Sequence, residues 1–229
     1  AKKLLESNSK VILLESGGLN PSFAHNELNK GVNSGSRFLS LDASRMRCFG
    51  GASRIWAGVC APFNKEDFEQ KPYVPLSGWP IQKEDLDQYY KEAANMLGIS
   101  YDLFDHNQSI NYSFSGLSFP RLGGKNSFLS TTVRQTSDLN NRNFGEKYKK
   151  LFSDSNNVDV LFHSTVSKLN VSKNGKKIIS IEAQDLTSKK CTIDAKKYVL
   201  AAGALENPRL LLHANDLFKN GIGNESGFV

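Results

Sequence analysis

The segment from Arg45 to Gly58 combines basic, glycine, hydroxyl and aromatic residues without the spacing of a helix or a strand. Paired glycines, Gly50 and Gly51, let a backbone approach a flat or phosphorylated group closely. Ser53 can donate a hydrogen bond to such a group, and Trp56 offers a large apolar face. The pattern predicts a ligand-binding surface, while an ordinary glycine turn before a core tryptophan remains the alternative.

An acidic residue, Glu15, follows the apolar run from Val11 to Leu14, which is typical of a buried parallel strand. A carboxylate at the end of such a strand can accept hydrogen bonds from both ribose hydroxyls of an adenine dinucleotide, about 20 residues after a glycine-rich phosphate loop. Counting back that far passes Ala1, so we expect such a loop to precede this sequence. A solvent-facing glutamate at a strand end is the alternative.

A turn of small residues from Ala201 to Ala204 follows an apolar strand predicted to begin at Tyr198. Small side chains let a ligand lie against the backbone, and the helix predicted from Leu205 would direct free amide groups toward it. Pro208 suits the first turn of that helix. A plain connection between a strand and a helix would use the same residues.

No residue in the sequence is an obvious acid, base, nucleophile or metal ligand. The four histidines, which we expect to be structural or exposed, are His25, His106, His163 and His213. The three cysteines form no CxxC pair and have no nearby histidine, so neither a disulfide framework nor a zinc site is expected. The motifs of serine hydrolases and zinc peptidases are also missing from the sequence.

The composition is that of a soluble globular protein, with 39% hydrophobic and 23% charged residues among 229. The net charge is +6, but the lysines form scattered pairs, so a nucleic-acid surface is not expected. No run reaches the roughly 18 apolar residues of a membrane span. Because the chain begins without Met in what reads as the middle of a helix, we expect a fragment or a processed product, and its localisation stays open.

Apolar periodicity predicts most of the remaining elements. A helix is expected over 86–97, ended by Gly98. Short strands, which would build a small antiparallel layer with a turn at 174–175, are predicted at 158–162, 165–171, 177–183 and 191–195. Residues 19–44 predict a long surface excursion, and 100–145 predict an irregular lobe or several short strands.

Taken in order, four of these segments resemble motifs of the glucose-methanol-choline oxidoreductases, FAD-dependent enzymes that oxidise alcohols and sugars. Residues 11–18 (VILLESGG) look like the family's second strand with its ribose-binding acid. Residues 47–58 (RCFGGASRIWAG) look like the first family signature, which lies along the flavin. Residues 77–90 are similar to the linker helix of the sugar-dehydrogenase and pyranose-oxidase side of the family, and 203–212 (GALENPRLLL) look like the second signature.

The resemblance implies an α/β fold. It would comprise a Rossmann-like FAD-binding domain, with a parallel sheet and a small antiparallel layer, and part of a substrate-binding α+β lobe, truncated at both ends. The implied domains are the FAD-binding domain at 1–75 and 156–229, and the linker helix with the substrate-binding lobe at 76–155. The residues implied to bind FAD are Glu15, Ser16, Gly17, Arg47, Gly50, Gly51, Ala52, Ser53, Trp56, Ala57, Gly58, Val166, Ala202 and Gly203.

Departures from the family pattern refine these expectations. Ile55 stands where some relatives carry a histidine that attaches the flavin covalently, so noncovalent FAD is expected. Trp56, in place of a frequent asparagine, favours the sugar-dehydrogenase side. Asn207 replaces a usual serine or threonine in the second signature. The catalytic histidine of the family would come after Val229, so no catalytic residue is expected in this chain, which would be inactive alone.

The implied activity is oxidation of the CH–OH group of a sugar, polyol or other alcohol by hydride transfer to flavin. The expected partner is therefore a small-molecule alcohol or sugar, with the electron acceptor open and with neither nucleic acid nor a membrane span involved. Two alternatives remain: another FAD-fold reductase or oxidase with a different substrate, and a noncatalytic basic binding module that holds an acidic polymer.

Overall fold

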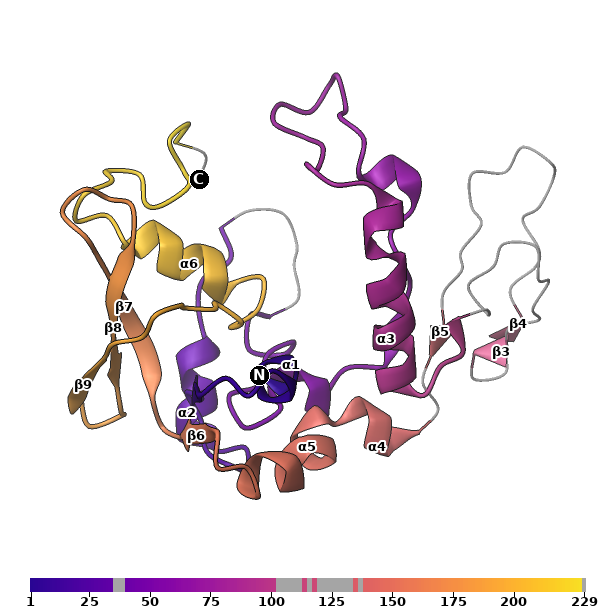
Figure 1. Cartoon of the computed structure of the whole chain (residues 1–229), viewed down its shortest axis with the longest axis horizontal. Helices are drawn as coiled ribbons and strands as arrows, with labels where there is room; N and C mark the ends of the chain where they lie inside the picture. The colour runs from indigo at the N-terminus through magenta and orange to yellow at the C-terminus, as the bar shows by residue number, and fades with distance from the viewer. Residues whose placement is uncertain (35–39, 102–112, 115–116, 119–133, 136–137, 228–229) are drawn as a thin grey trace. The chain divides into compact units, whose positions relative to one another are not determined.

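The computed structural model describes residues 1–34, 40–101, 113–114, 117–118, 134–135 and 138–227. Its elements form a mixed α/β fold with parallel and antiparallel strand pairs (Figure 1). The chain divides into two compact units, the first made of Ala1–Ala52 with Tyr148–Val229 and the second of Ser53–Lys147. The predicted domain boundaries lie near residues 75 and 155 instead, and the cofactor and substrate roles given to those domains remain predictions.

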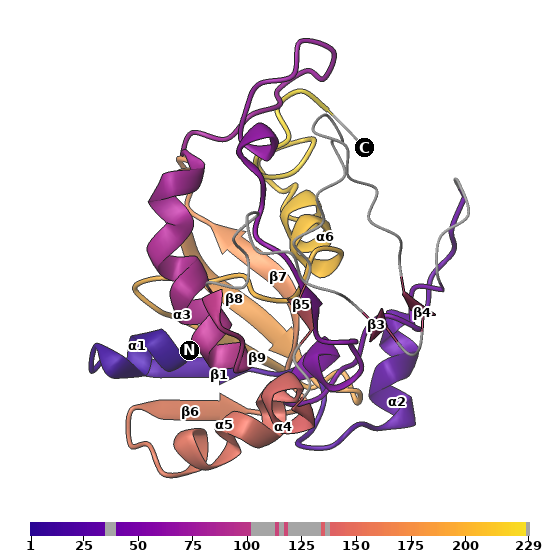
Figure 2. The same ribbon diagram turned by 90° about the vertical axis from the view of Figure 1, so that its right-hand side faces the viewer.

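In the first unit, β1 (Val11–Leu14) and β6 (Val158–Leu161) lie side by side as a parallel pair (Figure 2). The prediction of a parallel strand at 11–14 is confirmed, but its full burial is wrong, since Ile12 is 48% exposed. Among the described strands β1 has one partner, so part of its surface stays uncovered. The assignment of β6 to the antiparallel layer is also wrong, because its backbone completes the ladder with β1 instead.

Three strands of the first unit form an antiparallel sheet in the order β7-β8-β9. They are β7 (Thr165–Val171), β8 (Ile178–Gln184) and β9 (Lys190–Ile193). The β7–β8 turn places Gly175 at a φ of +71°, and its N–H donates to the carbonyl of Ser172 at 2.7 Å. Glycine adopts this left-handed conformation without a steric cost, so the predicted turn and the three-stranded layer are confirmed.

Helix α6 (Glu206–His213) packs against this sheet and closes the core of the first unit (Figure 1). The buried cluster consists of Leu169, Ile181, Leu210 and Ala214. Pro208 stands in the first turn of α6, where a missing N–H costs no hydrogen bond. Since burying a leucine side chain contributes about 1.5–3 kcal/mol, this cluster holds the helix on the sheet.

The strand predicted from Tyr198 does not form, and residues 198–203 are irregular. Val199 is 74% exposed, and the side chain of Asn207 meets two backbone groups that a strand would pair with a neighbour. Its Oδ1 accepts from the N–H of Ala202 at 2.9 Å, and its Nδ2 donates to the carbonyl of Leu200 at 3.2 Å. The side chain of Asn207 thus makes the hydrogen bonds to this backbone that a neighbouring strand would have made.

The N-terminal part of the first unit contains α1 (Lys2–Glu6), as expected. The excursion predicted over 19–44 includes two short helices, α2 (Phe23–Asn26) and the 3₁₀ helix η1 (Glu27–Asn29). Ser22 caps α2 by accepting the N–H of His25, which explains why this polar stretch is helical at that point.

The second unit is built around α3 (Asp87–Leu97), which confirms the predicted helix. Gly98 ends it in the left-handed conformation, at a φ of +67°. The other elements that lie wholly within this unit are β2 (Val59–Cys60), η3 (Lys65–Asp67), η4 (Lys83–Leu86), β3 (Ser113–Phe114), β4 (Leu117–Ser118), β5 (Arg134–Gln135) and α4 (Leu139–Arg142). Two elements, η2 (Gly51–Arg54) and α5 (Phe144–Ser153), cross the unit boundaries.

The lobe predicted over 100–145 falls largely outside the described residues, and so does His106. Where that stretch is described, it supplies the short antiparallel pair β3–β4 and the strand β5, which pairs with β2. Within the described parts of the chain, no helix has the length and apolar character needed to cross a membrane.

Candidate cofactor site

Glu15 directly follows β1, and its carboxylate contacts the backbone of the loop that comes next in the chain. Its Oε1 accepts a hydrogen bond from the N–H of Gly17 at 2.8 Å. Burial raises the pKa of Glu15, although the Gly17 amide and the charge of Arg47 act in the opposite direction. The strand therefore delivers a partly desolvated acid whose ionised form gains from any further hydrogen-bond donor.

The loop after β1 meets the start of the 45–58 segment through backbone contacts. Gly18 and Cys48 form a parallel bridge, and the N–H of Phe49 donates to the carbonyl of Gly18 at 2.9 Å. A Cβ added to Gly17 would lie 2.0 Å from the carbonyl oxygen of Arg47, so only glycine permits this approach. The structure thus brings together two segments that the sequence analysis assigned to one ligand.

Ser16 links the same loop to β7 and to the Arg47 side chain. Its Oγ lies 2.7 Å from the Oγ1 of Thr165 and accepts from the Nη1 of Arg47 at 3.0 Å. Thr165 directly precedes Val166, so Val166 is also brought to this region. Leu14 and Val166 pack against the same buried cluster of the first unit.

The small-residue turn before α6 belongs to the same unit. Leu200, just before this turn, packs against that buried cluster as well. Gly203 has a φ of +92°, and a Cβ added there would find no atom within 4 Å. The carbonyl of Gly203 accepts the N–H of Asn207 at 3.0 Å, which fixes the start of α6. This turn therefore has an open side against which a ligand can lie.

The remaining predicted residues of the 45–58 segment divide between the two units. Gly50 and Gly51 of the first unit have φ values of +95° and +53°, and Ala52 ends its N-terminal stretch. Ser53 begins the second unit, and Gly58 has a φ of +72°. These positive angles account for the absence of periodicity that the sequence shows here.

In the second unit, Ser53 and Trp56 both contact the junction of α4 and α5. The Oγ of Ser53 accepts the N–H of Phe144 at 3.1 Å, and the Nε1 of Trp56 donates to the carbonyl of Arg142 at 2.9 Å. The Trp56 and Phe144 rings lie 6.3 Å apart between centroids. The polar edge of Trp56 is thus held by protein, whereas Ala57 beside it is exposed.

Three arginines surround Glu206, the first residue of α6, and of these residues the sequence analysis assigned only Arg47 to the cofactor site. Its Oε1 lies 2.6 Å from the Nη1 of Arg45 and 3.4 Å from the Nη2 of Arg47, and its Oε2 lies 2.7 Å from the Nη2 of Arg209. Burial alone would raise the pKa of Glu206, but the bond from Arg209 and the nearby guanidinium charges outweigh it and lower that pKa. Glu206 therefore stays ionised.

Asn29 accepts hydrogen bonds from two of these arginines, Arg45 and Arg47. Its Oδ1 accepts from the Nε of Arg47 at 2.8 Å, and its carbonyl accepts from the Nη2 of Arg45. The Asn29 side chain is only 2% exposed, and its Nδ2 has no hydrogen-bond partner among the described residues. No local pattern marks these contacts, because Arg45 and Glu206 lie 161 residues apart.

Two of the histidines that look dispersed in the sequence are neighbours in the first unit. The Nε2 of His25 and the Nδ1 of His163 lie 3.1 Å apart, and the Oγ of Ser22 lies 2.7 Å from the Nδ1 of His25. Burial lowers the pKa of His25, and the charges of His163 and Arg47 lower it further. The described residues bring no group of three or more potential metal ligands together.

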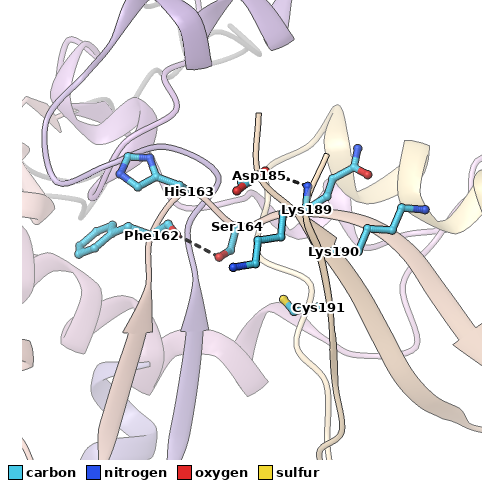
Figure 3. Close-up of a pocket in the computed structure, with 8 residues that line it drawn as sticks. Phe162, His163, Ser164, Asp185, Lys189, Lys190 and Cys191 are labelled. Carbon is cyan, nitrogen blue, oxygen red and sulfur yellow. Dashed lines mark hydrogen bonds between the residues drawn. The ribbon is translucent and has the colours of Figure 1, made fainter. Parts of the chain in front are cut away.

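A hollow of about 240 Å³ lies at the carboxyl end of β6, and Figure 3 shows the side chains that line it. Residues 162–164 line one part of it, and 184–185 with 189–191 of the β8–β9 hairpin line the rest. The hollow is smaller than the roughly 300–1,000 Å³ of a typical ligand pocket. None of the residues predicted to bind the cofactor lines it, so it is not the predicted cofactor site.

The first unit thus combines a parallel strand pair, in which β1 ends just before Glu15, with an antiparallel sheet covered by α6. The profile of the GMC oxidoreductase family matches residues 12–225 of this chain, which therefore belongs to that family. The family prediction is thus confirmed. The chain is an FAD-binding domain of an oxidoreductase, and its cofactor is FAD. No curated protein matches the chain.

Proposed function

We propose that this chain holds FAD for an enzyme that oxidises the CH–OH group of a sugar, polyol or other alcohol. FAD supplies the chemistry of the reaction by accepting a hydride from the substrate carbon. The observation that carries the proposal is the desolvated carboxylate of Glu15 at the end of the parallel strand β1. A ribose offers two hydroxyl donors to this carboxylate in addition to the Gly17 amide.

The residues of the first unit fit the adenosine end of FAD. In the proposal Glu15 accepts the ribose hydroxyls, and the backbone of Val166 meets the adenine. Ala202 and the open side of Gly203 allow the cofactor to pass close to the main chain. Ser16 and Gly17 shape the loop that carries Glu15, and the guanidinium of Arg47 offsets negative charge on the pyrophosphate.

Residues 50–58 are proposed to cover the flavin side, as the family resemblance implies. Their glycine angles allow close backbone approach, and the half-buried Trp56 supplies an apolar face. Ile55 offers no atom that could form a bond to the flavin, so the proposal includes noncovalent FAD. Acid precipitation tests this, because noncovalent flavin passes into the supernatant whereas covalent flavin stays with the protein.

The substrate class is tested with the native protein loaded with FAD. Aldoses, polyols, choline and simple alcohols are offered separately without oxygen, and bleaching of the flavin absorbance reports reduction. We expect reduction by a sugar or polyol, in keeping with Trp56 in the first signature. The proposal would be contradicted if none of the alcohols reduced the flavin but a substrate without a CH–OH group did. That result would favour another FAD-fold reductase.

A further inference from the structure

A continuous series of polar contacts runs through the first unit from Glu206 to Thr165. Glu206 pairs with the Nη2 of Arg47 at 3.4 Å, and the Nη1 of Arg47 donates to Ser16 at 3.0 Å. The hydroxyl of Ser16 then lies 2.7 Å from that of Thr165. These four side chains, which we call the Glu206 series, join segments that lie far apart in the sequence.

Every segment joined by the Glu206 series carries a residue of the proposed FAD site. Glu206 begins the helix that follows Gly203, and Arg47 is itself a proposed contact. Ser16 follows Glu15, and Thr165 precedes Val166. The series therefore connects the parts of the first unit that must keep fixed separations for the adenosine end of FAD to bind.

The first contact of the series, between Glu206 and Arg47, is shielded from solvent. The side chains of Glu206 and Arg47 are 13% and 12% exposed, so salt and water screen their attraction less than that of a surface pair. Arg45 holds the same oxygen of Glu206 at 2.6 Å. Arg45 and Arg47 are also anchored on Asn29, so the carboxylate sits between two guanidinium groups whose positions are fixed.

Charge explains why Glu206 sets the position of Arg47. Three guanidinium groups, from Arg45, Arg47 and Arg209, converge on the one carboxylate of Glu206. If that carboxylate were neutral, Arg45 and Arg47 would repel each other in a partly desolvated place. Arg47 would then shift relative to Ser16, because Asn29 and Ser16 are neutral acceptors, which hold a charged guanidinium less strongly than a carboxylate does.

We propose that Glu206 is a positioning residue for the adenosine end of FAD, acting through Arg47 and Ser16 without touching the cofactor. The inference rests on the proposed function of Glu15 and its neighbours. Glu206 belongs to the second signature, residues 203–212, and the loop after β1 contains Ser16, so a residue near the end of the sequence would fix the geometry of a loop near its start.

The test compares ligand affinities of the flavin-free native protein, measured by calorimetric titration with FAD and separately with ADP, which carries only the adenosine end. We expect Glu206→Gln to weaken both ligands about tenfold or more, a loss of about 1.4 kcal/mol for each factor of ten. Equal affinities of the variant and the unaltered protein for both ligands would overturn the positioning role.

Glu6→Gln is the matched control. Glu6 pairs with Lys2 in α1 of the same unit, but its side chain is 48% exposed and it has no place in the Glu206 series. We expect its affinities for FAD and ADP to stay within about twofold, since exposed ion pairs contribute little. A loss as large as that of Glu206→Gln would contradict the role assigned to Arg47 and Ser16.

Ser16→Ala distinguishes positioning from a general loss of stability. If Glu206 acts through Ser16, the double variant with Glu206→Gln and Ser16→Ala binds ADP no more weakly than whichever single variant has the lower ADP affinity. Both changes then break the same series of contacts. Additive losses would contradict the proposal. If Glu206→Gln fails to fold, Glu206→Asp keeps the charge but is too short to reach both Arg45 and Arg47, so it is expected to lose ADP affinity; normal affinity would contradict the proposal.

Glu15→Gln separates a failure of this inference from a failure of the proposed function. If Glu15→Gln weakens FAD and ADP but Glu206→Gln leaves both unchanged, the positioning role is wrong while the FAD site stands. If Glu15→Gln also leaves both affinities unchanged, the adenosine site itself is wrong.

Discussion

The carbonyl oxygen of Arg47 occupies the place where a side chain on Gly17 would begin, only 2.0 Å from an added Cβ. Gly17→Ala therefore forces two backbones apart, and since overpacking typically costs about 1–3 kcal/mol, we expect a lower melting temperature and less bound flavin. Gly31→Ala is the control, because its φ lies outside the left-handed region and a Cβ there meets only the end of the flexible Leu41 side chain. A melting temperature of Gly17→Ala equal to or above that of the control would contradict this close approach.

Removal of the Glu15 carboxylate is expected to reduce FAD retention. Glu15→Ala loses two charge-assisted hydrogen bonds to the ribose, worth roughly 1.5–3 kcal/mol each. Flavin occupancy after gel filtration and the affinity for added FAD measure the loss. Asp159→Asn, which changes an exposed acid on β6, serves as the control and should bind normally. Normal FAD affinity of Glu15→Ala would rule out the ribose role.

The affinity for FAD is expected to fall in acid. Burial raises the pKa of Glu15 in the flavin-free protein, and ribose donors favour its ionised form. Binding is therefore at full strength above that raised pKa and is lost as the pH falls through it. Titrations across this range check the prediction, and Glu15→Gln should remove this dependence; its persistence in the variant would assign it to another group.

The same pKa shift has a consequence for stability. Since the folded protein holds the Glu15 proton more tightly than the unfolded chain, the contribution of Glu15 to the free energy of unfolding is fully present below its ordinary pKa. It is lost as the pH rises through the raised pKa. Urea unfolding of flavin-free protein with and without Glu15→Gln measures it, and the opposite slope would contradict the raised pKa.

A bulky residue at either of two glycines should exclude the cofactor. Gly203→Val adds a side chain where no protein atom lies within 4 Å, and Gly51→Val adds one 3.8 Å from the carbonyl of Met46. Each also strains a backbone of positive φ. We expect lower flavin content in both folded variants, measured against total protein; a normal content would remove that glycine from the site.

Local patterns were enough to predict the strands β1 and β6 to β9 and the helices α1, α3 and α6, whereas the helices α2, α4 and α5 were not predicted. The helix α3 carries its apolar spacing and its Gly98 cap within one short stretch, and β7 to β9 alternate with recognisable turns. The strand expected at 198–203 failed because its outcome depended on Asn207, whose side chain takes the backbone groups that a neighbouring strand would have paired. The strand propensity of residues 198–203 does not reveal that the Asn207 side chain will take these backbone hydrogen bonds.

In the candidate site too, residues with a local sequence pattern could be predicted, whereas contacts between distant residues could not. Glu15 and the glycines could be proposed from the sequence because strand ends and paired glycines are visible there, and the family motifs gave their order. The contact between Arg45 and Glu206 spans 161 residues, and that between His25 and His163 spans 138. Neither pair has a local signature, since only the folded chain decides which distant charges share a partly buried place.

The absorbance spectrum of the purified native protein is the decisive test of FAD binding. We expect a flavin spectrum, release of that flavin into the supernatant on acid precipitation, and loss of the bound flavin in Glu15→Ala. A protein that carries no flavin and binds none when FAD is added would contradict this expectation.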